Sequence, residues 1–526
     1  MRNRFFFTLA LAVLLAACQT TRPDRPEALP TTPQAPDEAF EFIIVQLNDV
    51  YEISGLDGGS VGGMARVATV LKQLKEKNPN TLAILSGDFI SPSLISSLKQ
   101  GETPVAGKQM VAAMNAVGID YVTFGNHEFD VSETSLQARI DESDFGYFSG
   151  NVLQQTVRAP GDTLRAPFRQ RGTPIPEYAS HTFQTPRGQQ VRLGLIGVTL
   201  PFNKKPYVYY KDIYTEGMRT YEAARAGHDL IFGITHLAID EDRALARRLP
   251  DLPFIMGGHE HEDMLVIEGN TRITKADANA RTVYIHWITY HTGTGAVDIW
   301  SQLMPITEDI PADPSTKAVV DGWEQQANQA IREMGYDPTD DVAQFSEPYD
   351  GREASIRNEP TNLGRAIACA MLAEDPTAAF AFLNSGSIRV DDQLEGKISQ
   401  RDVLRMLPFG GAIVQGRFKG NLLQRILDIG LGQDVYGSGA YLQITPNVQK
   451  KNDGTYEIDA RPLDPNGVYE AVVPQFLSDG GEDVLSFMKD DPSIYTALNL
   501  QPRNDLRDVT IKYLKSKPEN WETCAN

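Results

Sequence analysis

Short apolar runs alternate with amphipathic segments through the first part of this chain. Apolar residues dominate 41–47, 81–85 and 121–123, and each run has the length of a buried strand. Between these runs, 65–77 and 107–117 are predicted to form helices. The alternation continues with predicted strands at 191–198, 230–234, 253–256, 282–288 and 296–300 and a predicted helix at 216–226. The pattern predicts an α/β layered domain over residues 40–310.

A second pattern begins after a proline-rich break between Pro305 and Pro314. A predicted helix at 316–334 lies in the segment 311–344, which we interpret as a linker. Residues 345–526 are predicted to form a second α/β domain. Its expected elements are helices at 361–373, 401–407 and 420–429 and strands at 379–383 and 469–473. With 526 residues the chain is too long for one core and is expected to divide into two or three domains.

Polar residues follow the predicted strands of the first domain at the points where the strands end. They are Asp49, Asp88, Asn126, His236, His259 and His261. In α/β sheets the chemistry lies at the carboxyl ends of the strands, so we expect these side chains to meet. Carboxylate, amide and imidazole ligands suit two adjacent divalent cations, of which Mn, Zn, Fe, Mg and Co are the candidates. Each residue alone would fit an ordinary turn, and only the ordered set favours a metal centre.

The first residues predict export and a lipid anchor. Arg2 and Arg4 precede an apolar run at 5–17, which is too short to cross a bilayer, and Cys18 follows it. Residues 1–18 look like a lipoprotein signal peptide and lipobox, with lipid on the thiol of Cys18. An ordinary signal peptide with a chance cysteine is the alternative. The proline-rich residues 19–39 are expected to form a flexible tether, which predicts a location in the bacterial periplasm or outer membrane.

The charge of the chain bears on its class of partner, and its cysteines bear on a possible disulfide. Acidic residues outnumber basic ones by 69 to 49, for a net charge of −20, and no Lys/Arg cluster is present. A nucleic-acid polymer is therefore not an expected partner. Besides Cys18 the chain has only Cys369 and Cys524, and the sequence leaves open whether these two form a bridge.

The chain resembles the two-domain calcineurin-like metallophosphoesterases of the periplasmic UDP-sugar hydrolase/5′-nucleotidase type, over about residues 40–490. In the first domain the matching motifs are Asn48-Asp49-Val50-Tyr51, Gly87-Asp88, Gly125-Asn126-His127-Glu128, Thr235-His236 and Gly258-His259-Glu260-His261. In the second they are Pro360-Thr361-Asn362-Leu363-Gly364, Asn384-Ser385-Gly386-Ser387-Ile388-Arg389, Pro408-Phe409-Gly410-Gly411 and Gly480-Gly481-Glu482-Asp483. The resemblance implies a four-layer αββα double β-sandwich, a linker helix and a C-terminal substrate-binding domain.

The resemblance also implies a role for each matched residue. Asp88 would bridge two metal ions, with Asp49 and His261 on one ion and Asn126, His236 and His259 on the other. His127 would not be a ligand. Oriented by Asp130, it would assist the leaving group while a metal-bound hydroxide attacks phosphorus. Glu128 is interpreted as structural.

Three positions depart from the family pattern. Tyr51 stands where a histidine is usual, so it is either a harder ligand or leaves one metal with a ligand fewer. Gly411 stands where many relatives have asparagine, and Glu482 lies in a changed Gly-Asp-Gly motif. The resemblance still implies a substrate pocket formed by Arg357, Asn384, Arg389, Phe409, Phe476 and Glu482, with the two phenylalanines stacking on a base. Core packing is the alternative for both rings.

The leading hypothesis is a metal-dependent phosphohydrolase of nucleoside 5′-monophosphates. The alternatives are a sugar-phosphate phosphatase of the glycosyl-phosphoglycerate type, because the Asp-Val-Tyr variant occurs there, and an enzyme for 2′,3′-cyclic nucleotides or UDP-sugars. A surface binding protein with the same fold is the non-enzyme alternative. The sequence makes no prediction of oligomeric state.

Overall fold

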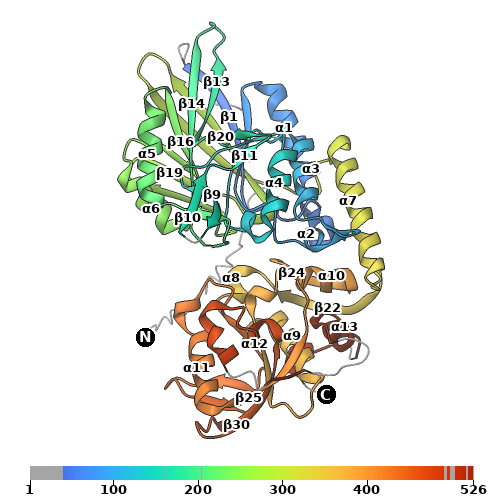
Figure 1. Ribbon diagram of the computed structural model, residues 1–526. Coiled ribbons are helices and arrows are strands. Elements are labelled where there is room, and N and C mark those ends of the chain that lie inside the picture. The colour runs from blue at the N-terminus through green and yellow to red at the C-terminus, as the bar shows by residue number, and fades with distance from the viewer. Residues whose placement is uncertain are drawn as a thin grey trace, which may run out of the picture. The chain divides into compact units, whose positions relative to one another are not determined.

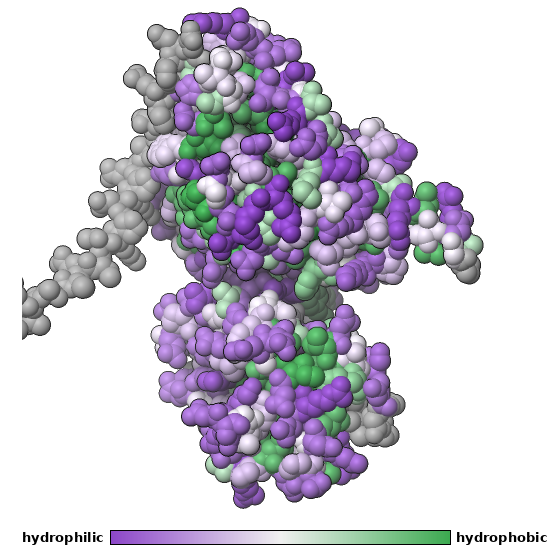
Figure 2. Space-filling view, turned by 90° about the vertical axis from the view of Figure 1, so that its left-hand side faces the viewer, coloured by the Kyte–Doolittle hydropathy of each residue, from purple (hydrophilic) through white to green (hydrophobic). Residues whose placement is uncertain are grey.

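The computed structural model describes residues 39–159, 161–202, 204–490, 495–497, 504–516 and 519–524. Cys18 and the predicted signal peptide lie outside the described residues, as does the tether except for its last residue. Among the described residues, no helix is both long and apolar enough to cross a bilayer. Hydrophilic residues cover most of the face in Figure 2, with smaller hydrophobic patches between them.

Two six-stranded mixed sheets form the first domain (Figure 1). The first has the order β21 (Ala296–Pro305), β20 (Thr282–His291), β1 (Ala39–Leu47), β4 (Thr81–Ser86), β7 (Tyr121–Thr123) and β8 (Gly146–Tyr147). The second has the order β13 (Tyr178–Gln184), β14 (Gln190–Thr199), β16 (Leu230–His236), β17 (Phe254–Met256), β19 (Thr271–Lys275) and β18 (Met264–Glu268). Strands β1, β4, β7 and β8 pair in parallel, as do β14, β16, β17 and β19.

The two sheets pack face to face. Successive side chains of each strand point to opposite faces of its sheet, and the buried side chains on one face pack against the other sheet. Phe42 and Ile44 of β1 share one core with Phe232 and Ile234 of β16. Ile231 of β16 points the other way, into a second core under helices. The predicted four-layer αββα arrangement is thereby confirmed.

Helices cover the outer faces of both sheets. Helix α1 (Met64–Lys77) packs on β4 and on α3 (Lys108–Val117), and α7 (Pro314–Glu333) packs on both helices. Helices α5 (Ile213–Arg225) and α6 (Ile239–Arg248) cover the second sheet. Helix α7 lies within the segment predicted as a linker. The remaining elements of this domain are α2 (Leu94–Ser97), α4 (Glu133–Glu142), the sheet β10 (Asp162–Ala166), β9 (Val152–Ala159) and β15 (Val208–Tyr210), and the two-stranded pairs β2 (Gly55–Leu56) with β3 (Val61–Gly62), β5 (Lys99–Gln100) with β6 (Thr103–Pro104) and β11 (Arg169–Gln170) with β12 (Thr173–Pro174).

The second domain is built on a five-stranded sheet. Its order is β26 (Leu442–Ile444), β23 (Phe380–Asn384), β30 (Val468–Pro474), β25 (Ile413–Lys419) and β31 (Tyr495–Ala497). Two smaller sheets are β22 (Asp341–Asp350) with β24 (Gln393–Ser399), and β27 (Val448–Lys450), β28 (Tyr456–Ile458) and β29 (Arg461–Pro462). The helices are α8 (Glu353–Ile356), α9 (Asn362–Ala373), α10 (Gln400–Met406), α11 (Gly420–Gly430), α12 (Gln475–Ser478) and α13 (Leu506–Ser516). Strand β31, which the sequence analysis did not predict, follows β30 and pairs with β25.

A disulfide joins Cys369 on α9 to Cys524 near the end of the described chain. The sequence left this pairing open. The bridge and the packing of α13 on α9 together hold the C-terminal segment against the second domain.

Candidate metal centre

The predicted ligands lie together because five strands end at the same edge of the sandwich. Asp49 and Asp88 follow β1 and β4, and Asn126 follows β7. His236 ends β16, and His259 follows β17. Asp49, Asp88, Asn126 and His236 are almost completely buried. Carboxylates are rarely buried in this way without a partner of opposite charge.

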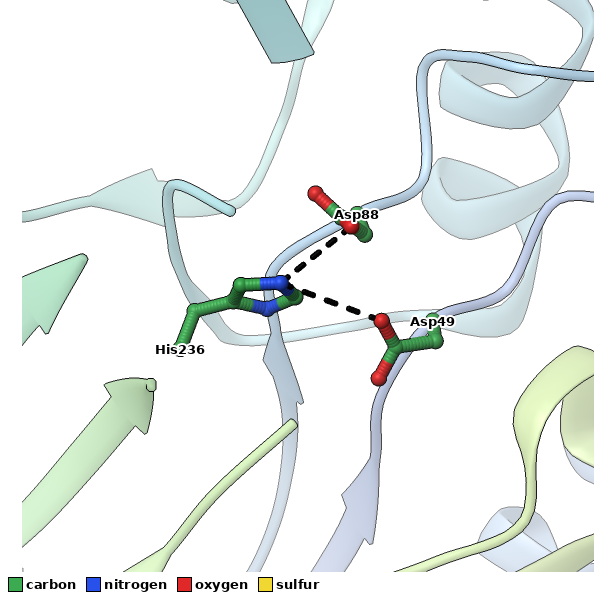
Figure 3. Close-up of side chains that lie close together, drawn as sticks. All are labelled: Asp49, Asp88 and His236. Atoms are coloured by element: carbon green, nitrogen blue, oxygen red, sulfur yellow. Dashed lines mark ion pairs between the residues drawn. The ribbon is translucent and has the colours of Figure 1, made fainter. Parts of the chain in front are cut away.

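Asp49, Asp88 and His236 form the centre of the site (Figure 3). Their ligand atoms lie within 4.8 Å of one another. The Nε2 atom of His236 is 3.2 Å from Oδ2 of Asp88 and 3.9 Å from Oδ1 of Asp49. In Figure 3 the same edge of the imidazole ring faces both carboxylates.

The orientation of His236 shows that this arrangement fits a cation. Its Nδ1 lies 2.8 Å from the carbonyl oxygen of Ser86, which only accepts, so Nδ1 carries the proton. Nε2 therefore faces the Asp88 carboxylate and Oδ1 of Asn126, which lies 3.2 Å away. Acceptors that converge on one point require a proton or a metal ion between them. Burial lowers the pKa of His236, but the Asp88 and Asp49 carboxylates outweigh burial and raise that pKa to about 9.

His261 and His259 complete the predicted ligand set. Nδ1 of His261 lies 2.8 Å from Oδ2 of Asp391, and its Nε2 lies 3.5 Å from Oδ1 of Asp49. A carboxylate on the far nitrogen is the usual way to orient a metal-binding histidine. The His259 ring centroid is 5.4 Å from that of His236, and the His259 backbone N–H donates to Oδ2 of Asp49 over 2.8 Å.

Four of the six predicted ligands have a left-handed backbone. The φ angles are 52° at Asp49, 58° at Asp88, 95° at His259 and 63° at His261. Each such conformation at a residue other than glycine costs on the order of 1–3 kcal/mol. Strain of this kind gathers at functional sites, where it directs several side chains to one point.

Two glycines allow the ligand loops to come close together. A Cβ atom on Gly125 would lie 2.1 Å from Oδ1 of Asp88, and one on Gly258 would lie 2.5 Å from the Ser86 carbonyl oxygen. Both distances are far below van der Waals contact, so any larger residue would push the loops apart.

The Tyr51 hydroxyl lies inside the donor cluster. It is 3.1 Å from Oδ2 of Asp88, 3.0 Å from Nε2 of His261 and 3.5 Å from Oδ1 of Asp49. Burial and then the Asp88 carboxylate raise the pKa of Tyr51 well above its usual value. The side chain is therefore a neutral phenol that donates a hydrogen bond to a carboxylate.

His127 has surroundings that differ from those of the ligands. Its Nδ1 lies 2.6 Å from Oδ2 of Asp130, and its backbone N–H donates to Oδ1 of Asp88 over 2.7 Å. Burial lowers the pKa of His127, but Asp130 and then Asp88 outweigh it, so this pKa lies above its usual value. An oriented imidazolium beside the carboxylate cluster can donate a proton.

Glu128 holds two of the ligand loops together. Its carboxylate accepts backbone N–H groups from Asp88, Phe89, Ile90 and Gly125. Glu128 therefore has a structural role, because its one side chain fixes the loops after β4 and β7. Burial, followed by the Asp88 carboxylate, raises its pKa to about 7.

Two of the predicted substrate residues contact Glu353 in the second domain. Arg357 and Arg389 both donate to its Oε1 atom, the latter over 3.2 Å. The Arg389 guanidinium lies 5.8 Å from the centroid of the Phe409 ring. Phe409 and Phe476 are 55% and 49% exposed, so core packing does not explain either ring.

Asn384 and Glu482 have other neighbours. Asn384 accepts a hydrogen bond from Ser387 within its own loop, over 2.8 Å. Burial and the neighbouring Asp483 raise the pKa of Glu482. Glu353 and Asp391, which contact the predicted arginines and His261, were missed by the sequence analysis, because no motif marks either residue.

The first domain, with the predicted ligands gathered at its strand ends, has the arrangement of a metallophosphoesterase. Residues 42–263 match the calcineurin-like phosphoesterase family, and residues 341–490 match the 5′-nucleotidase C-terminal domain. The chain therefore combines a calcineurin-like phosphoesterase domain with a 5′-nucleotidase C-terminal domain. It is an enzyme, a metal-dependent phosphoric ester hydrolase.

Individual relatives share this two-domain arrangement. Protein UshA of Yersinia enterocolitica is 25% identical over 511 residues, which cover 85% of this chain and 86% of UshA. The 5′-nucleotidase of Vibrio parahaemolyticus is 26% identical over 496 residues, which cover 85% of each chain. The crystal structure of a 5′-nucleotidase precursor from Thermus thermophilus matches with a TM-score of 0.72 and 23% identity, over 91% of this chain and 96% of that one, and shows that the fold is shared.

Proposed function

We propose that this protein hydrolyses nucleoside 5′-monophosphates at a centre of two divalent cations. The proposed ligands are Asp49, Asp88, Asn126, His236, His259 and His261. The observation that carries the proposal is the convergence of the Asp88, Asp49 and Asn126 oxygens on His236 Nε2. This donor set suits Mn, Zn, Fe, Mg or Co.

The proposed mechanism assigns one step to His127. Bound divalent cations would lower the pKa of a water molecule and offset the charge of the phosphoryl oxygens. His127, held by Asp130 through Nδ1, presents Nε2 as the acid that protonates the leaving alkoxide. Asp130 and Asp88 raise the pKa of His127, which favours the protonated imidazole. Tyr51 donates to Asp88 and so limits how that carboxylate turns.

The second domain is proposed to bind the nucleoside. Phe409 and Phe476 are about half exposed, and a base can stack on an aromatic ring whatever its identity. Arg389 lies beside Phe409 and, with Arg357, supplies positive charge for an anionic substrate. Relatives named 5′-nucleotidase that cover most of this chain agree with a nucleotide substrate.

A sugar phosphate is the second candidate substrate. At Gly411 the backbone φ is 106°, and no atom lies within 4 Å of the position that a Cβ would occupy. No side chain can reach a base from this position. Only the two rings would therefore recognise a base, and stacking does not select for one.

Phosphate release from a substrate panel tests the proposal. The panel contains AMP, UDP-glucose, a 2′,3′-cyclic nucleotide and several sugar phosphates, with and without added Mn²⁺. We expect AMP to give the highest kcat/KM. Turnover of a sugar phosphate with none of any nucleotide would refute the nucleotidase assignment. A metal-loaded protein that is inactive on every compound would favour a binding protein.

Export and lipid anchoring at Cys18 are proposed as well. The Cys369–Cys524 bridge supports an oxidising compartment, since disulfides are uncommon in the cytosol. Cys18→Ala should move the protein from the membrane fraction to the soluble fraction. Unchanged partition would refute the anchor.

A further inference from the structure

Lys275 is a buried cation directly behind the metal centre. It ends β19, and its side chain is 1% exposed. A buried ammonium group is stable only where carboxylates and carbonyl oxygens surround it. Lys275 has no role in the mechanism above, and an ammonium group cannot bind a cation.

The partners of Lys275 lie next to three of the proposed ligands in the sequence. Its Nζ donates to the carbonyl oxygens of Leu237 over 2.6 Å and of Gly258 over 2.8 Å. Leu237 follows His236, and Gly258 precedes His259. Nζ also forms an ion pair with Glu260, which lies between His259 and His261.

A second set of contacts ties the same group to helix α6. Nζ lies 2.8 Å from Oδ2 of Asp242 on α6, and Oδ1 of Asp242 accepts a hydrogen bond from Thr235 over 2.6 Å. Thr235 immediately precedes His236. Glu260 in turn accepts the backbone N–H of Ile239, at the start of α6. A single cation therefore links the loop after β16, the loop after β17 and the helix between them.

The lysine side chain is also closely packed against the loop that follows β17. A Cβ atom on Gly257 would lie 2.8 Å from Cε of Lys275, so glycine is required where the loop passes the lysine side chain. The loop that carries His259 and His261 is thus held by Lys275 on both sides of His259.

We propose that Lys275 is a positioning residue that sets the spacing of His236, His259 and His261 and thereby the affinity of the metal centre. This inference rests on the proposed function, because it takes these histidines as ligands. Residues behind the ligands commonly contribute 10–100-fold to metal affinity, and we expect an effect of that size here.

Mn²⁺ titration by calorimetry on the full, chelator-stripped chain tests the inference. Lys275→Met keeps most of the side-chain length but removes the charge and its hydrogen bonds. We expect Mn²⁺ binding to weaken 10–100-fold and kcat to fall more than KM rises. If this variant bound Mn²⁺ with wild-type affinity, the inference would be overturned but the proposed function would stand. Failure of the wild-type chain itself to bind Mn²⁺ would overturn the proposed function and, with it, the inference.

A second variant separates positioning from stability. Lys275→Met combined with Asp242→Asn and Glu260→Gln removes the carboxylates that Lys275→Met leaves unpaired, so much of the lost stability should return. If Lys275 positions the ligands, Mn²⁺ binding stays weak in the triple variant. Recovery of Mn²⁺ affinity together with stability would overturn the inference.

Arg139→Met is the matched control. Arg139 is also a buried cation of the first domain, and it donates to the Val105 carbonyl oxygen and to Glu142, neither of which is a proposed ligand. This variant should lower stability without weakening Mn²⁺ binding. An equal loss of Mn²⁺ affinity in Arg139→Met would overturn the specific role of Lys275.

Discussion

His127 and Asn126 are adjacent in the sequence, but their side chains have different neighbours. The Asn126 oxygen faces His236, whereas the His127 ring is held by Asp130. Adjacent residues can divide binding and proton transfer in this way because η2 (His127–Asp130) begins between them.

His127→Ala should lower kcat by about 10²–10⁴-fold, the usual contribution of general acid catalysis, while metal content stays at the wild-type level. Kinetics and metal analysis on the same preparation measure both quantities. Asp88→Ala is the comparison variant and should lose metal. Loss of metal in His127→Ala would show that His127 is a ligand.

Tyr51→Phe distinguishes a hydrogen-bond donor from a metal ligand. The Tyr51 hydroxyl contacts Asp88 and His261 at ordinary hydrogen-bond distances. We therefore expect Tyr51→Phe to keep its full metal content and to lose less than about tenfold in kcat/KM, which corresponds to roughly one hydrogen bond. The loss of one metal equivalent on elemental analysis would contradict this expectation.

At the scale of elements, the sequence predicted the strands that end at the proposed ligands but missed strands β13, β18 and β19 and helix α6. The strands that end at Asp49, Asp88 and His236 are strongly apolar, and both flanks of each strand are polar. Helix α6 was missed because its sequence, IDEDRALARR, contains few apolar residues. Its acidic first turn and basic last turn suit the helix dipole, and its few buried residues pack on the second sheet.

The N-terminal cap of helix α7 can be tested by mutation. Oδ1 of Asp313 accepts the backbone N–H of Thr316 over 2.9 Å, and its carboxylate also pairs with Lys72 of α1. Asp313→Ala should lower the free energy of unfolding by about 1–2 kcal/mol through loss of this cap. Asp321→Ala, at an exposed position of the same helix, is the control and should change it by less than about 0.5 kcal/mol.

The same cap predicts a dependence on pH. Lys72 first, and then the hydroxyl and backbone N–H groups around it, lower the pKa of Asp313. The contribution of the cap is therefore complete above the pKa of an unfolded aspartate, about 4, and is lost as the pH falls further. Denaturation of wild type and Asp313→Ala at pH 7 and pH 3 measures this. A difference between the two proteins that stays constant would refute the prediction.

At the scale of the whole molecule, the sequence predicted the class of site but not its second layer of contacts. Glu353 and Asp391 contact His261 across about 90 and 130 positions of sequence, and Lys275 is one lysine among many. Only folding shows that these three lie beside ligands. The Cys369–Cys524 pair was equally open, because two cysteines 155 positions apart give no geometric information.

Cys524→Ser should destabilise the second domain in particular. A bridge between residues 155 positions apart restricts the unfolded chain strongly, and its loss typically costs about 2–5 kcal/mol. Denaturant unfolding followed by a probe in each domain should show the loss in the second domain only. Wild-type protein in reductant should match the variant, and equal stability of all three samples would contradict the prediction.

The left-handed backbone at Asp49, Asp88, His259 and His261 has a consequence for the history of such a chain. Folding alone gives no reason to keep aspartate or histidine at these positions, since glycine would adopt the same conformation without strain. If they are the proposed metal ligands, we expect selection for phosphoester hydrolysis to maintain them. A descendant released from that selection would become more stable as it lost its metal ligands, and would drift toward a binding protein with an unchanged fold.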